Sequence, residues 1–292
     1  MSTQGMIGLA FPRQGGMPAI LRPAGRISQL PWFMGAGAVA LAAGAAVSWV
    51  FSGYPQPLDL FLRSLGGLFL TGFALVECAL SLACWRLFDR DEPLRRAWLL
   101  LALAAACRAM GLVASTLVTG LTADPGPAAA DWGQSSGASL TLALTAVGLL
   151  LVLRACHSLG RLSRPSVPES IFLSLVGALM WGRFIAVTRA ARPVEALGGV
   201  SYLLVGLLLL EAVLLRRSVQ DMGEGLVGRC WGAYVAAIFL TAAGAMGGWA
   251  LISGYLPWHY RALNSIVLLW AALAFALAPA HQVEAILRAR RR

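Results

Sequence analysis

The chain has 292 residues, of which 59% are hydrophobic and 12% charged, and its mean hydropathy is +0.74. A soluble domain carries roughly twice that charged fraction, so the composition excludes a soluble globular protein and predicts a helical bundle in a lipid bilayer. The net charge of +10 comes from arginines that lie beside apolar segments, which excludes a nucleic-acid-binding face.

The elements follow a basic tail. Residues 1–31 carry three arginines and no acid, which predicts a cytoplasmic tail. Eight apolar segments follow, each long enough to cross a bilayer: 32–51, 61–86, 97–118, 139–158, 170–188, 198–215, 230–252 and 262–279. The long connection 119–137 is rich in Pro, Gly and acids and is predicted to be a loop. The predicted fold class is an all-α, polytopic membrane bundle of about eight transmembrane helices.

The arginines predict the orientation. They are concentrated in the tail, in the connections 86–96, 154–164 and 216–229, and at the C-terminal end. By the positive-inside rule, both termini are expected in the cytoplasm, with the protein in the plasma or inner membrane of a bacterium. These arginine clusters are expected to bind anionic lipid. Because the sequence contains no lysine, a Schiff base with retinal or pyridoxal is excluded.

Aromatic and small residues predict how the helices meet lipid and one another. Trp98 and Trp231 belong to a group of tryptophans near the predicted span ends, where an interfacial belt is expected. Small residues in 35–46 and in the "GAMGG" stretch (244–248) predict close packing of helix backbones, in central helices or at a subunit contact. The five cysteines show no metal-ligand spacing and are interpreted as packing residues.

The sequence also contains an internal similarity. Matching stretches occur in the same order in both halves: "RRAW" (95–98) with "GRCW" (228–231), "LGG" (65–67) with "LGG" (197–199), and "HSLGRLSR" (157–164) with "HQVEAILR" (281–288). This order predicts a tandem duplication of a four-helix unit. The expected organisation is the tail 1–31, a first four-helix repeat 32–164, and a second repeat 165–292 that carries a basic C-terminal tail. Both repeats then point the same way, as in some transporters.

An arginine in the middle of an apolar segment needs a partner. Arg108 lies about 17 Å from the cytoplasmic end of its helix, and Glu77 on the preceding helix lies about 15 Å from the same face. A buried carboxylate offsets the free energy of placing the guanidinium in a membrane. We expect Glu77 and Arg108 to pair inside the bundle. Two interpretations remain open: a structural lock between helices, or a gated pair that opens when a proton or an anion arrives.

The second half departs from this pattern. Glu211 corresponds to Glu77, but Thr241 stands near the place of Arg108. Arg183 is a candidate partner for Glu211, although the two differ in depth. Alternatively, Arg63, Arg108 and Arg183 converge in the outer half of the bundle and bind an anion or a lipid head group.

His157 and His281 correspond in the predicted repeat and lie at the cytoplasmic ends of the fourth and eighth segments. Paired histidines on helices hold haem in membrane cytochromes through one axial bond each, so haem is a candidate cofactor. The alternative is that both histidines are solvated residues at the membrane surface, beside arginine-rich connections.

No catalytic motif of the hydrolase, metalloprotease or P-loop type is present, which favours a non-catalytic protein. Three functions remain. The first is a sensory or accessory subunit that assembles with a membrane-protein partner or as a homo-oligomer. The second is a transporter of a small, anionic or proton-coupled solute that uses Glu77, Arg108, Arg183 and Glu211. The third is a haem-binding electron carrier that uses His157 and His281.

Overall fold

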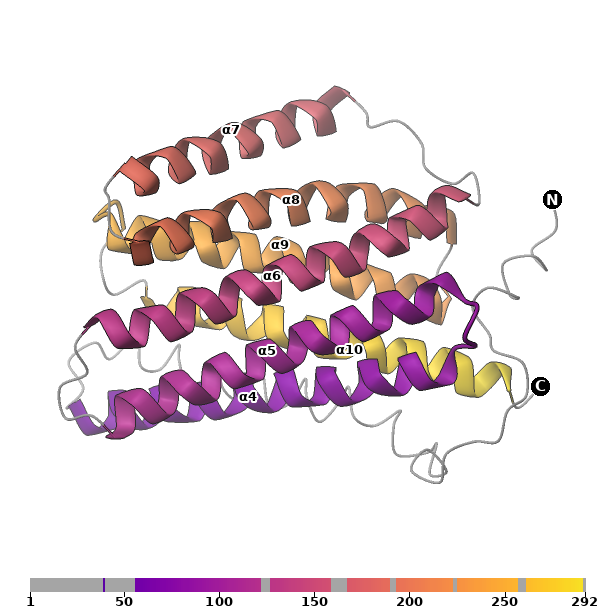
Figure 1. The fold of residues 1–292 in the computed structure, drawn as a ribbon, viewed down its shortest axis with the longest axis horizontal. Helices are drawn as coiled ribbons and strands as arrows, with labels where there is room; N and C mark the ends of the chain where they lie inside the picture. The colour runs from indigo at the N-terminus through magenta and orange to yellow at the C-terminus, as the bar shows by residue number, and fades with distance from the viewer. Residues whose placement is uncertain are drawn as a thin grey trace.

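The computed structural model describes residues 56–121, 127–158, 167–189, 193–222, 225–256 and 261–290, together with residue 39. These residues form seven helices and no strand: α4 (Gln56–Leu87), α5 (Pro93–Leu121), α6 (Pro127–Ser158), α7 (Val167–Arg189), α8 (Pro193–Met222), α9 (Leu226–Ile252) and α10 (Arg261–Ala289) (Figure 1).

Five of the described helices are long and apolar enough to cross a membrane. The candidate spans are Gly67–Leu87, Pro93–Ala114, Gly137–Cys156, Leu226–Leu251 and Asn264–Ala289. The described part of the chain is therefore all-helical, and the protein is a multi-pass integral membrane protein. The count of eight spans stays a prediction, because the segment 32–51 lies outside the described residues and neither α7 nor α8 is among the five.

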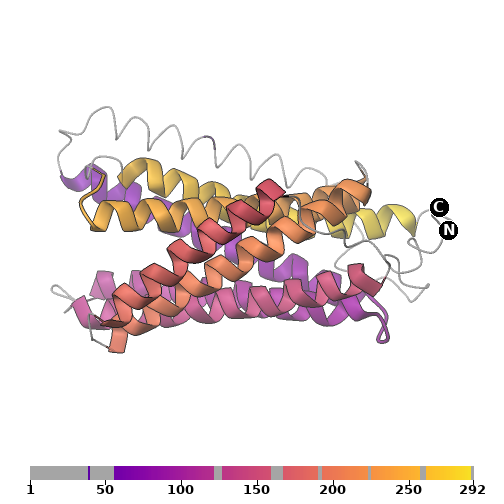
Figure 2. The same cartoon turned by 90° about the horizontal axis from the view of Figure 1, so that it is seen from above.

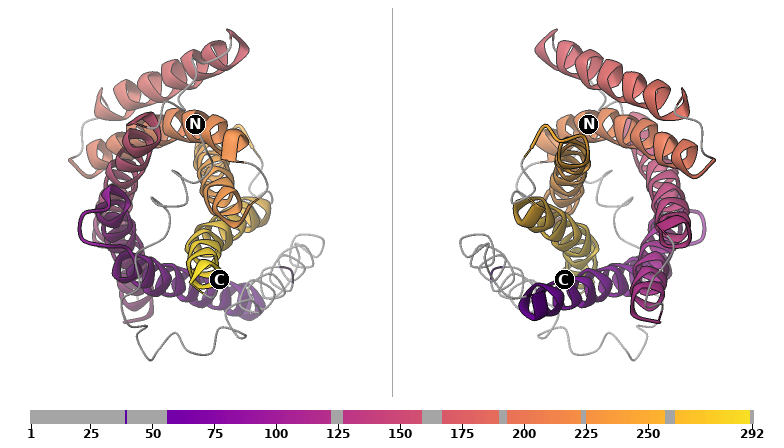
Figure 3. Two further views of the ribbon diagram at one scale, coloured as in Figure 1. Left: turned by 90° about the vertical axis from the view of Figure 1, so that its right-hand side faces the viewer. Right: turned by 90° about the vertical axis from the view of Figure 1, so that its left-hand side faces the viewer.

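Six helices form a closed ring. Each contacts the next in the order α4, α5, α6, α8, α9 and α10, and α10 returns to α4. The end-on views show this ring (Figure 3). Helix α7 lies outside it against α8, and the two run obliquely across the other helices (Figure 2). The main buried cluster is built by side chains from all six ring helices, from Cys84 on α4 to Leu287 on α10.

One end of the ring carries the described arginine clusters, and we name it the basic end. There α4, α6, α8 and α10 end and α5 and α9 begin, on the right in Figure 1. The described arginines near these termini are Arg86, Arg90, Arg95, Arg96, Arg154, Arg216, Arg217, Arg229, Arg288 and Arg290. Their gathering at one end follows from the antiparallel run of neighbouring helices.

Two predicted boundaries were wrong. Most of the predicted loop 119–137 is helical, because α5 continues to Leu121 and α6 begins at Pro127. Proline suits the first position of a helix, and the alanines that follow have the highest helix propensity. The last helix was predicted to end at Pro279 but continues to Ala289. Apolar residues flank Pro279, and a packed membrane helix tolerates the single backbone hydrogen bond that proline removes.

The glycines of the "GAMGG" stretch lie where α9 crosses α10. A Cβ atom added to Gly244 would collide with the Leu268 side chain, and one added to Gly247 would lie 2.5 Å from Asn264 Oδ1. In α9 these glycines therefore allow close contact between helices of one chain. The other small-residue stretch, 35–46, lies outside the described residues apart from Val39.

Candidate functional site

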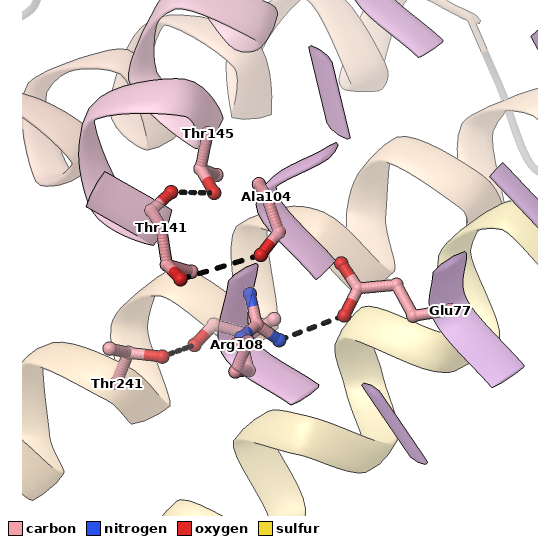
Figure 4. A network of polar contacts seen from close by, with 7 residues as sticks. Glu77, Ala104, Arg108, Thr141, Thr145 and Thr241 are labelled. Carbon is pink, nitrogen blue, oxygen red and sulfur yellow. Dashed lines mark hydrogen bonds and ion pairs between the residues drawn. The ribbon is translucent and has the colours of Figure 1, made fainter. Parts of the chain in front are cut away.

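The structure brings Glu77 and Arg108 together inside the ring. Arg108 Nη1 donates a hydrogen bond of 2.8 Å to Glu77 Oε2, from α5 to α4 (Figure 4). The Glu77 side chain is 2% exposed, whereas that of Arg108 is 19% exposed. The guanidinium carbon of Arg108 also lies 4.3 Å from the ring centroid of Phe275 on α10. Arg108 therefore joins three helices, with a carboxylate on one side and an aromatic face on another.

The local helix pattern explains why Glu77 faces inward. Ala74, Ser81 and Cys84 are each at most 1% exposed, and they lie on the same face of α4 as Glu77 at spacings of three, four and seven residues. Cys84 Sγ contacts the carbonyl oxygen of Pro279 on α10 at 3.7 Å. This face is thus the contact surface of α4 within the ring, and it carries the carboxylate into the bundle.

A layer of threonines lies around Arg108. Thr141 Oγ1 on α6 donates to the carbonyl oxygen of Ala104, and Thr145 Oγ1 donates to that of Thr141, at 3.4 and 2.8 Å. Thr241, the counterpart of Arg108 in the predicted repeat, donates at 2.8 Å to the carbonyl oxygen of Ala237 in its own helix. Figure 4 shows Thr241 and Arg108 in one view. The Thr241 hydroxyl is satisfied locally and does not replace the guanidinium.

The second predicted carboxylate is also buried. The Glu211 side chain on α8 is 3% exposed, and its Oε2 atom has no hydrogen-bond partner within the described part of the chain. The candidate partner Arg183 lies on α7, but its side chain is outside the described residues, as is that of Arg63. The expected Glu211–Arg183 pair and the three-arginine anion site therefore stay predictions.

Sequence reasoning missed the aromatic centre of the ring. The ring centroids of Trp98 and Trp231 are 5.4 Å apart, those of Trp231 and Tyr234 are 5.6 Å apart, and those of Tyr234 and Phe275 are 5.9 Å apart. Trp98 and Trp231 are at most 2% exposed, so the expected place in an interfacial belt was wrong for both. The signal that could have found them is the match between "RRAW" and "GRCW", since both motifs end in the indole that the fold buries.

The two predicted haem ligands are not brought together by any described contact. His281 is half-buried within α10, and its Nδ1 atom has no hydrogen-bond partner among the described residues. Its expected place at a helix end was wrong, because α10 continues past it. The side chain of His157 lies outside the described residues. No group of three or more metal-ligating side chains occurs in the described ranges, and no disulfide joins the cysteines there.

The site therefore consists of a buried ion pair between consecutive helices, an aromatic cluster towards the basic end, and a second buried carboxylate on α8. Comparison of the chain with models of known protein families, with curated proteins and with solved structures found no match.

Proposed function

We propose that the protein is a proton-coupled transporter of a small anion, built from two related halves. The observation that carries this proposal is the Glu77–Arg108 ion pair inside a closed ring of helices. Ionisable side chains within membrane-spanning helices often belong to functional sites, because moving their charges out of water costs free energy.

The pair supplies a coupling mechanism. The Arg108 guanidinium is a cation that only donates hydrogen bonds, whereas the Glu77 carboxylate can accept a proton. When Glu77 is protonated, it no longer neutralises the guanidinium, and Arg108 is left to bind an anion. One proton and one monovalent anion then occupy the site together with no change in net charge. The partial exposure of Arg108 beside the buried Glu77 suits an anion that reaches the arginine.

The ring topology supports the two halves. The contacts α4–α5, α5–α6 and α6–α8 have the counterparts α8–α9, α9–α10 and α10–α4. Between α5 and α9, identical residues recur at a constant spacing of 133: Arg96 and Arg229, Trp98 and Trp231, Ala104 and Ala237, Ala109 and Ala242, and Gly111 and Gly244. Such a duplication has a twofold axis along the membrane normal, and the ion pair and Glu211 belong to opposite halves.

Flux measurements test the proposal. The purified chain is reconstituted into vesicles that enclose a pH-sensitive dye, and formate or nitrate is offered under an imposed pH gradient. We expect Arg108→Gln to abolish anion-dependent proton movement. Glu77→Gln is expected to leave anion movement but to uncouple it from protons. Arg154→Gln, at an exposed arginine on α6, is the matched control. Coupled flux that survives Glu77→Gln unchanged would reject the assignment.

A second candidate function, a sensory or accessory subunit, is favoured by helix α7. It packs against α8 outside the ring, and its exposed apolar side chains include Ile171, Leu175, Leu179 and Trp181. An added Cβ atom at Gly177 or Gly182 would meet no atom within 4 Å among the described residues. Such a face suits a helix of a membrane-protein partner or of a second copy. Transport by the isolated protein would count against this candidate, and stable co-purification with another membrane protein would favour it.

A further inference from the structure

Four helices bury polar atoms without partners in the half of the ring nearer the basic end. They are Ser81 Oγ on α4, Trp98 Nε1 on α5, Tyr234 Oη on α9 and Gln282 Oε1 on α10. Each side chain is at most 1% exposed, and none of these atoms has a hydrogen-bond partner within the ranges that the structure describes. The ion-pair mechanism does not use them.

The four side chains lie at similar depths in the ring. The rings of Trp98 and Tyr234 have centroids 6.1 Å apart, and the Tyr234 hydroxyl lies near that of Ser81 without the geometry of a hydrogen bond. Gln282 is one helical turn from Pro279, whose carbonyl oxygen contacts Cys84, and Cys84 is one turn from Ser81. Helix rise places Ser81 and Gln282 about 10 Å and Glu77 about 15 Å from the basic end. The orphaned atoms therefore lie between that end and the carboxylate.

We propose that these four side chains hold a chain of water molecules that carries protons between the basic end and Glu77. Buried polar atoms without protein partners are satisfied in native proteins by ordered water, which takes two to four polar partners. This inference rests on the proposed function, because it supplies the proton that releases Arg108.

The chemistry of the four atoms suits this role. The hydroxyls of Ser81 and Tyr234 both donate and accept, so each takes up one proton and passes one on. The indole of Trp98 only donates and the carbonyl of Gln282 only accepts, so these two orient the water molecules. One O–H bond breaks in a hydronium ion at the basic end, which leaves a water molecule there, and one O–H bond forms on the Glu77 carboxylate, while each hydroxyl and water molecule between them gains one proton and loses one. Arg108 from α5 is hydrogen-bonded to Glu77, Tyr234 from α9 is near enough to interact with it electrostatically, and Phe275 on α10 covers the guanidinium.

Infrared spectroscopy of the full chain in lipid nanodiscs tests this path. The carbonyl stretch of a protonated carboxyl group is followed after a change of pH and assigned to Glu77 by its loss in Glu77→Gln. The rate at which this band shifts in deuterium oxide then reports proton access to Glu77. Tyr234→Phe, alone and combined with Ser81→Ala, is compared with Thr241→Val. This control removes a hydroxyl from α9 that is bonded within its own helix.

We expect the exchange to slow by about a hundredfold in the double variant, which is the low end of the contribution of a positioned proton-transferring side chain. Thr241→Val is expected to exchange at the wild-type rate. Wild-type exchange in the double variant, or the lack of a Glu77 band at every pH, overturns the path. The measurement needs no transported anion. A slowed exchange without flux would therefore reject transport alone, and flux with unchanged exchange would reject the path alone.

Discussion

Trp98 of α5 packs against Trp231 of α9 with ring centroids 5.4 Å apart and an angle of 32° between the ring planes. The two residues end the matching motifs "RRAW" and "GRCW". In a molecule with a twofold axis, equivalent residues meet only at that axis. The indole pair therefore marks where the axis of the two proposed halves would pass, between α5 and α9.

The ion pair predicts a strong coupling between two substitutions. Glu77→Gln or Arg108→Gln alone leaves one buried group without its partner and is expected to lower the free energy of unfolding by about 3 kcal/mol. The double variant is expected to lose clearly less than the sum of the two single losses. A double-mutant cycle from unfolding in mixed micelles measures this. Additive losses would show that the hydrogen bond of 2.8 Å contributes no coupling.

Glu211 is predicted to behave differently from Glu77. Its Oε2 atom is buried without a hydrogen-bond partner among the described residues. The hydrogen bonds to water that this atom loses on burial are therefore not replaced in the native protein. Glu211→Gln keeps the volume and is expected to change the free energy of unfolding by less than about 1 kcal/mol. The same unfolding measurement compares it with Glu77→Gln. An equally large loss in both variants would contradict the difference.

Replacing two different glycines of α9 by alanine is predicted to change the stability of the protein in opposite directions. Gly244→Ala places a Cβ atom against Leu268, and we expect a loss of about 1–3 kcal/mol from the overpacked crossing of α9 and α10. At Gly232 an added Cβ atom meets nothing within 4 Å among the described residues, so Gly232→Ala is expected to gain up to about 1 kcal/mol from helix propensity. Thermal unfolding of both variants checks the pair, and a stabilising Gly244→Ala would contradict it.

The turn between α4 and α5 predicts a dependence of stability on pH. Burial, reinforced by the negative charge of Asp89, raises the pKa of Glu92 from 4.5 to about 7. The folded state then binds a proton that the unfolded state has already released, so stability decreases as pH rises between these two values. Glu92→Gln is expected to flatten this part of the profile. Unfolding measured across the interval tests it, and an unchanged slope in the variant would assign the dependence to other groups.

The orientation can be tested by labelling. Arg90 is exposed in the turn at the basic end, and Tyr255 is 74% exposed at the opposite end, just after α9. A membrane-impermeant maleimide is expected to label Tyr255→Cys in intact cells, but Arg90→Cys only after lysis, as the positive-inside rule requires. The parent protein, whose five cysteines are buried or partly buried, is the control. Labelling of Arg90→Cys in intact cells would invert the predicted orientation.

The bilayer explains which features were predictable. Spanning helices need a minimum apolar length, so the five candidate spans all fall on predicted segments, and α7 and α8 overlap two more as helices. Glu77 and Arg108 were matched by depth, because helix rise converts sequence position into distance along the membrane normal. Sequence position does not predict the direction in which a side chain points around its helix when every face of that helix is apolar. Trp98 was therefore assigned to the membrane interface, whereas its side chain is buried inside the bundle.

The partners of α4 could not be predicted for the same reason. Helices that are apolar all round show no stripe that identifies their neighbours. The contact between α4 and α10 joins Cys84 to Pro279, which are 195 residues apart. Pro279 itself suggested a helix end, because the sequence does not reveal that packing in the ring stabilises the interrupted helix.

The closure of the ring by α10 bears on the order in which the protein is made. Helix α10 is the last ring helix to leave the ribosome, so α4 must reside in the lipid before its second neighbour exists. The α4–α5 hairpin already contains both Glu77 and Arg108, and each neutralises the other without help from later helices. The ion pair thus lowers the free energy of placing the α4–α5 hairpin alone in the bilayer during synthesis. This accounts for a carboxylate and a guanidinium on consecutive helices.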